Sequence, residues 1–378
     1  MDFSFDNLNI RDELLRGIYS YGFEKPSNIQ NKAIPIINKG SDLIAQSQSG
    51  TGKTGAFSIG ILNNINLEEK EIQSIIISPT HELAEQTFEV MNNLSNYMEG
   101  INIKKVIGKT NITASKIELQ QNPHILIATP GRLLDMINRK YIFTDKIKSV
   151  VFDEADEILS RGFMETIYQL IRYLPDTTQI LLFSATIPDE ILDMTLKFMN
   201  NPEKILVNKE ELTLEGIMQF YINCNMYKWK YDVLYDLYDS ISINQCIIYV
   251  NTKNTLMNLV DRLNERQFPI SFIHGDLSSD QRKDNLNNFK AGKTRILLST
   301  DLLSRGIDIQ QLSLVINFDI PKNKETYIHR IGRSGRYGRK GVSINFICNN
   351  DIDDLNEIKK FYNTQIIEMP ENICDYIN

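Results

Sequence analysis

Residues Ala45 to Thr54 read AQSQSGTGKT, a run that ends like a phosphate-binding loop. A strand pattern, DLIA (42–45), precedes it, and a helical pattern, TGAFSIGILNNI (54–65), follows it. In that context Gly50 and Gly52 let backbone N–H groups converge on phosphate oxygens, next to the positive end of the helix dipole. The alternative is a surface loop of small residues.

The polar residues of this loop suit a nucleoside triphosphate. Lys53 can reach the β- and γ-phosphates, and Thr54 can supply an oxygen ligand for Mg²⁺. Ser47 stands where the strict pattern has glycine. Its side chain is small, and the phosphate cradle depends on Gly50 and Gly52, so we expect the loop to function.

A second group of candidates is VVFDEAD (150–156), in which an apolar strand ends at Asp153 and Glu154. In enzymes with a phosphate-binding loop, the first acid holds Mg²⁺ and a neighbouring carboxylate can orient and deprotonate water. These acids could instead cap the helix expected over EILSRGFM. The phosphate loop about a hundred residues earlier favours the catalytic interpretation.

The third group is HRIGRSGRYGRKG (329–341), which is dense in arginine and glycine. We expect the glycines to let the backbone bend tightly while Arg330, Arg333 and Arg336 project. Arginines delivered from a second domain can stabilise the charge on a transferring phosphate. The alternative is a basic surface turn for solubility or RNA contact.

These residues need strands to position them, and the sequence predicts two sets of strands. Short apolar runs rich in β-branched residues alternate with helical patterns such as 82–98, which predicts parallel sheets with crossover helices. The scheme restarts after residues 204–216. The expected strands lie at 74–78, 124–129, 149–154 and 179–186, and then at 245–252, 271–276, 294–301, 314–319 and 342–347.

Small and charged residues follow these strands directly, as in PTHEL, TPGR, DEAD, SAT and TDLLSRG. In open parallel sheets, ligands bind outside the carboxyl ends of the strands. The pattern therefore predicts ligand binding at this edge in both halves of the chain.

Amino-acid composition and net charge limit the class of protein to which this chain can belong. A hydrophobic fraction of 42% and a charged fraction of 24% are ordinary for a globular protein, and 378 residues predict two or three domains. The net charge of −7 gives no global basic field, so any nucleic acid must be held by a local cleft.

The four cysteines, Cys224, Cys246, Cys348 and Cys374, are far apart and form no CxxC pair. This spacing predicts reduced thiols and no zinc site. The acidic N-terminal residues do not resemble a signal peptide, and no apolar run reaches the length of a membrane span. We therefore expect no membrane association and a cytoplasmic location, with a nuclear one also open.

The combination of motifs resembles the DEAD-box RNA helicase family, from Phe5 to the end of the chain. Within the family the resemblance is to translation initiation factor 4A and its exon-junction relative. It is carried by LLRGIYSYGFEKPSNIQ, DEADEILSRGF, KEELTLEGI, TDLLSRGIDIQQLSLVINFD, YIHRIGR and FYNTQIIEMPENI.

The resemblance implies two tandem RecA-like α/β domains, parallel-sheet P-loop domains joined by a flexible linker. Residues 1–207 would form the N-terminal ATP-binding helicase domain, with the Q-motif at 3–31. Residues 208–216 would be the linker, and residues 217–378 the C-terminal helicase domain.

The resemblance also implies the nucleotide site. Gln30 would bond the adenine edge, Phe23 would pack on its face with Phe5 as the upstream aromatic, and Asp308 would contact the ribose. ATP and Mg²⁺ are the implied cofactors. The implied catalytic residues are Lys53, Asp153, Glu154, His329, Arg333 and Arg336, the nucleotide-binding residues also include Ser47, Gln48, Ser49, Gly50, Thr51, Gly52 and Thr54, and the metal ligands are Thr54 and Asp153.

RNA would cross both halves through contacts to backbone and sugar, which carry little sequence specificity. SAT, Ser184 to Thr186, would couple the ATP state to unwinding. The implied RNA-binding residues are Thr80, His81, Gly108, Thr129, Arg132, Thr252, Arg282, Thr300 and Asp301.

Four positions depart from the family pattern. His81 replaces an arginine, Lys109 replaces the second of two glycines, Ser279 replaces a glutamine, and Ser47 replaces the loop glycine. Three of these changes, at His81, Lys109 and Ser279, fall along the expected RNA path, and only the change at Ser47 falls in the ATP site. We therefore expect ATP binding and hydrolysis to be intact and the affinity for RNA to be altered.

The resulting hypothesis is an RNA-stimulated ATPase that unwinds short RNA duplexes as a monomer, in translation initiation, with a scaffold protein of that pathway as partner. One alternative is an ATP-locked RNA clamp of the exon-junction type in mRNA processing. Another is a P-loop kinase or an unrelated small-molecule ATPase, which leaves HRIGRSGR and GFEKPSNIQ without a purpose.

Overall fold

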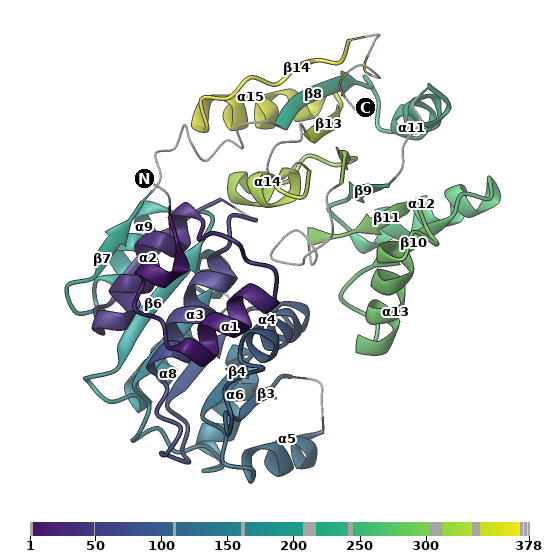
Figure 1. Cartoon of the computed structure of the whole chain (residues 1–378). Coiled ribbons are helices and arrows are strands. Elements are labelled where there is room, and N and C mark those ends of the chain that lie inside the picture. Colours follow the sequence, from purple (N-terminus) through teal and green to yellow (C-terminus); the bar gives the residue numbers. More distant parts are fainter. Residues whose placement is uncertain are drawn as a thin grey trace. The chain divides into compact units, whose positions relative to one another are not determined.

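The structure is a computed structural model of the chain, and it describes residues 3–48, 50–108, 111–159, 163–206, 217–240, 245–301, 312–334, 341–370, 373 and 376, with Ser279 lacking a described side chain. The chain divides into two compact units, Met1–Val207 and Asn208–Asn378 (Figure 1). The expected linker at 208–216 lies outside the described residues.

The first unit is built on a seven-stranded parallel sheet in the order β3-β4-β2-β5-β6-β1-β7. Its central strands are buried along their whole length, as expected for β-branched strands that are covered on both faces. The strands are β1 (Leu43–Gln46), β2 (Ser74–Ile77), β3 (Ile103–Val106), β4 (Ile125–Ala128), β5 (Ser149–Asp153), β6 (Gln179–Ser184) and β7 (Glu203–Ile205).

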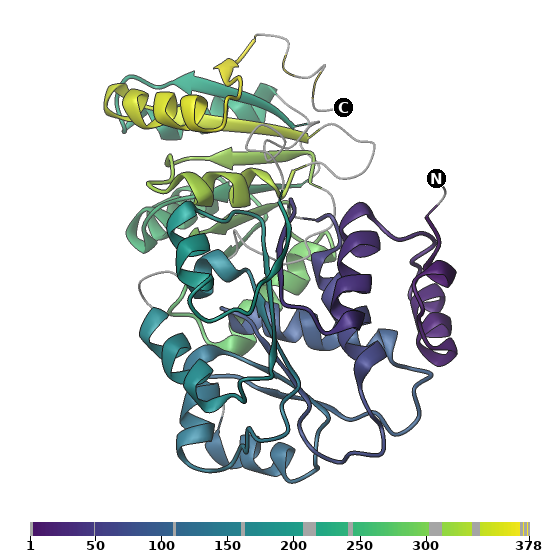
Figure 2. The same ribbon diagram turned by 90° about the vertical axis from the view of Figure 1, so that its left-hand side faces the viewer.

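Helices pack on both faces of this sheet (Figure 2). In β1, Leu43 and Ala45 face one core layer and Ile44 faces the other, as the two-residue period of a strand requires. The elements are η1 (Phe5–Asn7), α1 (Asp12–Ser20), α2 (Asn28–Lys39), α3 (Lys53–Asn64), α4 (His81–Leu94), α5 (Ile112–Leu119), α6 (Pro130–Asn138), α7 (Ala155–Ile158), α8 (Met164–Tyr173) and α9 (Asp189–Thr195).

The second unit repeats the plan with a parallel sheet in the order β10-β11-β9-β12-β13-β8-β14. Its strands are β8 (Ile217–Asn223), β9 (Cys246–Tyr249), β10 (Ile270–Ile273), β11 (Ile296–Ser299), β12 (Leu314–Asn317), β13 (Gly341–Ile347) and β14 (Ile367–Glu368). Its helical elements are α11 (Trp229–Ser240), α12 (Lys253–Glu265), α13 (Ser279–Lys290), α14 (Lys324–Ile331), η3 (Asn349–Asp351) and α15 (Ile352–Phe361).

The two faces of this second sheet differ in composition. On one face, α11 and α12 close an apolar layer that includes Phe220, Ile316 and Phe346. On the other face, α14 and α15 contribute Tyr327, Ile328 and Leu355 to a smaller apolar cluster.

The prediction of two α/β halves with parallel sheets is confirmed. The helix expected directly after the acids is shorter than its pattern, since α7 ends at Ile158 and α8 begins at Met164. Cys224, Cys246 and Cys348 are free thiols, and Cys374 lies outside the described residues. Within the described part of the chain, no helix combines the length and apolarity that a membrane crossing requires.

Candidate functional site

The predicted site residues of the first unit lie along the carboxyl edge of its sheet, in an order set by the topology. Residues assigned to RNA follow β3, β4 and β2, which are neighbours at one end of the sheet. The acids follow β5, SAT begins within β6, and the phosphate loop follows β1. The sheet therefore places the RNA set beside the ATP set, with β5 at the boundary.

The phosphate loop connects β1 to α3 through two glycines in the left-handed region, Gly50 (φ 79°) and Gly52 (φ 98°). Ser47 is held within the loop, because its hydroxyl lies 2.6 Å from the Thr51 hydroxyl. The buried Lys53 ammonium donates to the carbonyl oxygens of Ser47 (2.8 Å) and Gln48 (3.2 Å). Ser47 thus takes part in the loop's own hydrogen bonding, as its small size allows.

The residues assigned to adenine are tied to the same loop. Ser27 and Gln30 form a capping box at the start of α2, and Gln30 Nε2 donates to the Gly52 carbonyl at 3.3 Å. A Cβ on Gly55 would lie 2.7 Å from Gln30 Nε2 and 3.0 Å from a Phe23 ring carbon. The absence of a side chain at Gly55 therefore lets these two side chains lie against α3, a role that the sequence analysis missed.

Phe5 and Phe23 lie together, with stacked rings whose centroids are 6.4 Å apart. Phe5 is fully buried in the core of the first unit, while Phe23 packs at its margin. Phe5 therefore supports Phe23 from within the core.

The two acids at the end of β5 are buried, and the backbone of Glu154 is strained. Glu154 adopts left-handed backbone angles (φ 51°, ψ 57°), which are unfavourable for a residue with a Cβ. Its Oε2 atom is buried and has no hydrogen-bond partner among the described residues. Burial, and then the Glu154 carboxylate, raise the pKa of Asp153 to about 7, although Lys53 opposes the shift. A cation would relieve this accumulation of negative charge.

Asp156 links the acids to SAT. Its Oδ2 accepts a hydrogen bond from the Thr186 hydroxyl at 2.6 Å, and its backbone N–H reaches the Ser184 hydroxyl at 3.5 Å. These two contacts join the segment after β5 to the end of β6.

The RNA set of the first unit converges at the ends of β2, β3 and β4. The Thr129 hydroxyl accepts from the Gly108 N–H at 3.1 Å. A Cβ on Gly108 would lie 3.2 Å from His81 Nε2 and 3.7 Å from Thr129 Oγ1. Thr80 caps α4 through Leu83 N–H, and Arg132 Nη1 donates to Ser115 Oγ at 3.1 Å. Lys109 lies outside the described residues.

The RNA set of the second unit lies at equivalent strand ends. Thr252 follows β9 and caps α12, while Thr300 and Asp301 follow the adjacent β11. Arg282, on α13, is buried and donates from Nε to the Leu277 carbonyl at 3.2 Å.

The expectation that Arg330 projects is wrong. Arg330 is fully buried, and its guanidinium donates to Asp301 (2.6 Å), Asn251 (2.8 Å) and the Asp319 carbonyl (2.7 Å). A guanidinium has five donors in a rigid fork, so it can join several strand ends at once. Arg330 therefore ties together the ends of β9, β11 and β12.

The expectation that Arg333 projects is also wrong, since Arg333 is buried at the end of α14, where its N–H donates to the Arg330 carbonyl at 3.2 Å. His329, on α14, is buried as well. Ser49, Asp308 and Arg336 lie outside the described residues.

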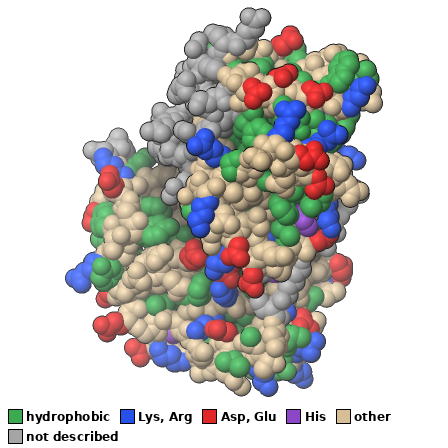
Figure 3. All heavy atoms as spheres, turned by 90° about the vertical axis from the view of Figure 1, so that its right-hand side faces the viewer, with side chains coloured by type: hydrophobic (Ala, Val, Ile, Leu, Met, Phe, Trp, Pro, Cys, Tyr) green, Lys and Arg blue, Asp and Glu red, His purple; other side chains and the backbone are tan. Residues whose placement is uncertain are grey.

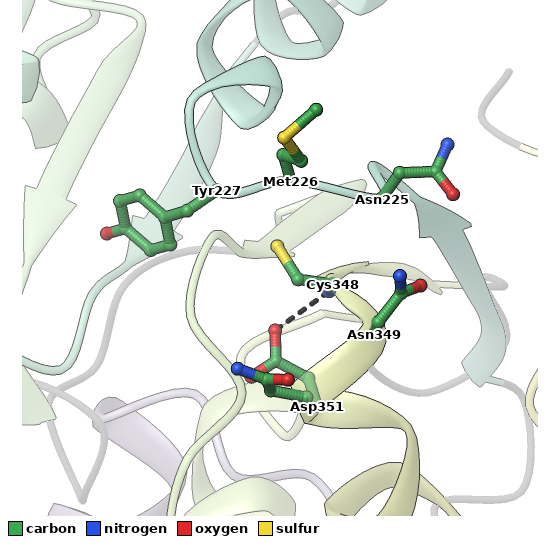
Figure 4. Close-up of a pocket in the computed structure, with 7 residues that line it drawn as sticks. Asn225, Met226, Tyr227, Cys348, Asn349 and Asp351 are labelled. Carbon is green, nitrogen blue, oxygen red and sulfur yellow. Dashed lines mark hydrogen bonds between the residues drawn. The ribbon is translucent and has the colours of Figure 1, made fainter.

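A hollow with a volume of about 350 Å³ lies between the β8–α11 turn and the segment after β13, and is lined by Asn225, Met226, Tyr227, Cys348, Asn349, Asn350 and Asp351. In Figure 4 the Cys348 sulfur points toward the turn, while its N–H donates to the Asp351 carboxylate at 2.9 Å. None of these residues belongs to the predicted site.

The surface offers no broad basic area on the face drawn in Figure 3, where basic and acidic side chains are interspersed. This agrees with the net charge of −7.

Comparison with known proteins bears directly on these motifs. Residues 27–194 match the family described as DEAD/DEAH box helicase, and residues 229–338 match the helicase conserved C-terminal domain. The chain is 50% identical to eukaryotic initiation factor 4A of Caenorhabditis elegans over 374 residues, which cover 99% of this chain and 93% of that protein. The chain belongs to the DEAD-box family of ATP-dependent RNA helicases.

Other similar proteins support the same family membership. The ATP-dependent RNA helicase eIF4A of Candida albicans is 52% identical, with 98% of this chain and 93% of that protein covered. The structure of Saccharomyces cerevisiae Dbp5 bound to RNA and ADP BeF3 matches with a TM-score of 0.92 at 37% identity, covering 98% of this chain and 97% of that one. The helicase therefore uses ATP and binds RNA.

Proposed function

We propose that this DEAD-box helicase acts in translation initiation, as an RNA-stimulated ATPase that remodels short RNA duplexes. The observation that supports the proposal is the shared sheet edge, where the residues proposed to bind RNA, after β2, β3 and β4, lie beside the acids and the phosphate loop. The assignment to initiation is supported by the relatives named initiation factor 4A.

In this proposal the phosphate loop and Lys53 bind the triphosphate, while Gln30 and Phe23 select adenine. Glu154 orients water and takes its proton, for which its unpartnered Oε2 is suited. Arg333 and Arg336 stabilise charge on the γ-phosphate when the second unit closes, and Asp308 contacts the ribose.

The residues present fit Mg²⁺. Thr54 and Asp153 would hold it, and the raised pKa of Asp153 reflects a buried carboxylate that lacks sufficient positive charge around it. The ion would supply charge neutralisation on the phosphate oxygens.

RNA binding is proposed to use backbone and sugar contacts at Thr80, His81, Gly108, Thr129 and Arg132 in the first unit. The second unit would add Thr252, Arg282, Thr300 and Asp301. Contacts of this type give affinity with little sequence preference. We further propose that the protein works as a monomer in the cytoplasm with a scaffold protein of the initiation type.

ATP hydrolysis by the full chain, with and without single-stranded RNA, tests the proposal. RNA should raise kcat in the parent protein, and Glu154→Gln should abolish that hydrolysis while retaining ATP-dependent RNA binding. Hydrolysis that does not respond to RNA, or that survives Glu154→Gln, contradicts the proposal.

A further inference from the structure

Helix α14 meets the second sheet through a layer of buried polar side chains. The strand residues beneath it include Gln219 of β8, Asn317 of β12 and Asn345 of β13, all less than 7% exposed. Their neighbours along the same strands, such as Phe220, Ile316 and Phe346, face the apolar layer on the opposite side. Buried amides are favourable only when they are hydrogen-bonded, so this layer demands a specific partner.

Tyr327 of α14 is that partner at one end of the layer. Its ring is fully buried, and its hydroxyl donates to Gln219 Oε1 at 2.8 Å. The same hydroxyl accepts from Asn345 Nδ2 at 3.3 Å. Gln219 is held in turn by Thr364, to whose hydroxyl its Nε2 donates at 3.0 Å.

The layer continues to Arg330, one turn further along the helix. Asn317 Nδ2 donates to Asn345 Oδ1 at 2.8 Å, and Asn317 Oδ1 accepts from Arg330 Nη1 at 3.3 Å. Tyr327 and Arg330 are therefore joined to the sheet through a single connected set of hydrogen bonds.

Two directional anchors one turn apart fix both the rotation and the axial position of a helix, which apolar packing alone does not. The helix has only eight residues, so few of its own hydrogen bonds oppose displacement. Its end carries Arg333, whose N–H donates to the Arg330 carbonyl. Small displacements of a group that acts on the reacting atoms can cost large factors in rate.

We propose that Tyr327 is a positioning residue, which holds α14 on its polar layer at the register that presents Arg333 for catalysis. The inference rests on the proposed role of Arg333 at the γ-phosphate. Arg330 also bonds Asp301, which follows β11 and is one of the residues proposed to bind RNA. The same layer therefore connects α14 to the end of β11.

The test compares Tyr327→Phe with Tyr238→Phe in the full chain. Tyr238 of α11 also bonds a buried partner, with its hydroxyl 2.6 Å from Cys246 Sγ, but it lies on the apolar side of the sheet. Both variants should lose similar stability. Only Tyr327→Phe should lower the RNA-saturated kcat, by about 3- to 10-fold, with the KM for ATP and the Kd for RNA within about twofold of the parent.

A second measurement combines Tyr327→Phe with Arg333→Ala. If Tyr327 acts through Arg333, adding Tyr327→Phe to Arg333→Ala should change kcat no further. Equal kcat losses in the two Tyr→Phe variants, an unchanged kcat in Tyr327→Phe, or multiplicative effects in the double variant would overturn the inference. Arg333→Ala with parental kcat would instead remove the proposed function on which the inference rests.

Discussion

His81 begins α4 next to Gly108 and Thr129, where the family pattern has a permanently charged arginine. Histidine lacks the permanent charge and the five-donor fork of arginine, so we expect this position to attract phosphate less than the family's arginine does. We expect His81→Arg to tighten single-stranded RNA binding by about 3- to 10-fold and to steepen the salt dependence by about one phosphate contact. RNA titrations at several salt concentrations measure both effects.

His81→Gln is the matched control, since it keeps a polar side chain without adding charge. It should leave both the affinity and its salt dependence close to those of the parent. An unchanged RNA affinity in His81→Arg would show that residue 81 does not influence RNA binding.

We expect His124 to make the first unit less stable in acid. Its ring is fully buried, its Nδ1 accepts from the Asn102 N–H at 3.0 Å, and burial lowers its pKa below 6.5. Below pH 6.5 the unfolded chain therefore binds a proton that the folded chain resists, so stability falls as the pH falls. His124→Gln should reduce the slope of unfolding free energy against pH by up to about 1.4 kcal/mol per pH unit.

Urea denaturation of the full chain between pH 5 and pH 7.5 measures this slope by far-UV circular dichroism. The fluorescence of Trp229, the single tryptophan and a residue of the second unit, provides an internal reference. The fluorescence transition should keep its pH dependence in His124→Gln. Equal slopes of unfolding free energy against pH for the parent and His124→Gln would show that His124 is not the source of the acid sensitivity.

The chemistry of single residues was partly predictable from sequence. The types and spacing of Gly50, Gly52 and Lys53 indicate phosphate binding, and the structure forms the loop they describe. Arg330 and Arg333 occur in one motif and were both expected to project, yet both are buried, and Arg330 bonds three strand ends. Spacing cannot reveal an internal arginine, because the partners of Arg330 at Asn251 and Asp301 come from distant segments.

At the scale of elements, α1 crosses α4 at Gly17. A Cβ at this position would lie 1.8 Å from the Leu94 carbonyl oxygen, a backbone atom that cannot move aside cheaply. Gly17→Ala should therefore separate the two helices and lower the free energy of unfolding by about 2 to 4 kcal/mol. Because α1 is the chain segment that connects Phe5 to Phe23, we expect ATP affinity to weaken as well.

Gly131→Ala is the control for Gly17→Ala. Gly131 is also helical, but its Cβ would meet nothing within 4 Å, so this change should be neutral or slightly stabilising. Thermal unfolding and ATP titration of both variants give the comparison. Equal unfolding midpoints for Gly17→Ala and Gly131→Ala would show that α1 and α4 can move apart at no cost in stability.

Strands with continuous apolar runs, such as 74–78 and 179–186, were predicted close to their observed bounds. The strands β3, β7, β8 and β14 were missed. Three of them, β3, β7 and β14, are short edge strands, and IKKV, EKI and IE lack the apolar run on which the prediction depends. The fourth, β8, is an inner strand whose apolar run is interrupted by Gln219. Edge strands need cover on fewer sides, so their sequences carry a weaker signal.

At the scale of the whole molecule, each unit has its own sheet and core, but the proposed catalytic groups are divided between the units. A chain truncated after residue 207 should fold and bind nucleotide. It should lose RNA-stimulated hydrolysis by a factor of about 10³ or more, because Arg333 and Arg336 are absent. ATPase assays with saturating RNA measure this loss, with Arg333→Ala in the full chain as reference. If RNA still stimulates ATP hydrolysis fully in the truncated chain, the second unit does not supply catalytic groups.

The sheet order has a consequence for biosynthesis. Strand β1 is the first strand of its unit to be translated, yet its neighbours are β6 and β7, so Leu43 pairs with Leu181 and Glu203. Since a chain emerges from the ribosome N-terminus first, β1 has no partner strand until β6 has appeared, and its second edge stays unpaired until residues near 205 have appeared. The phosphate loop is thus among the earliest parts of the nascent enzyme and among the last to mature, so a shortened translation product would carry the loop's sequence but not its geometry.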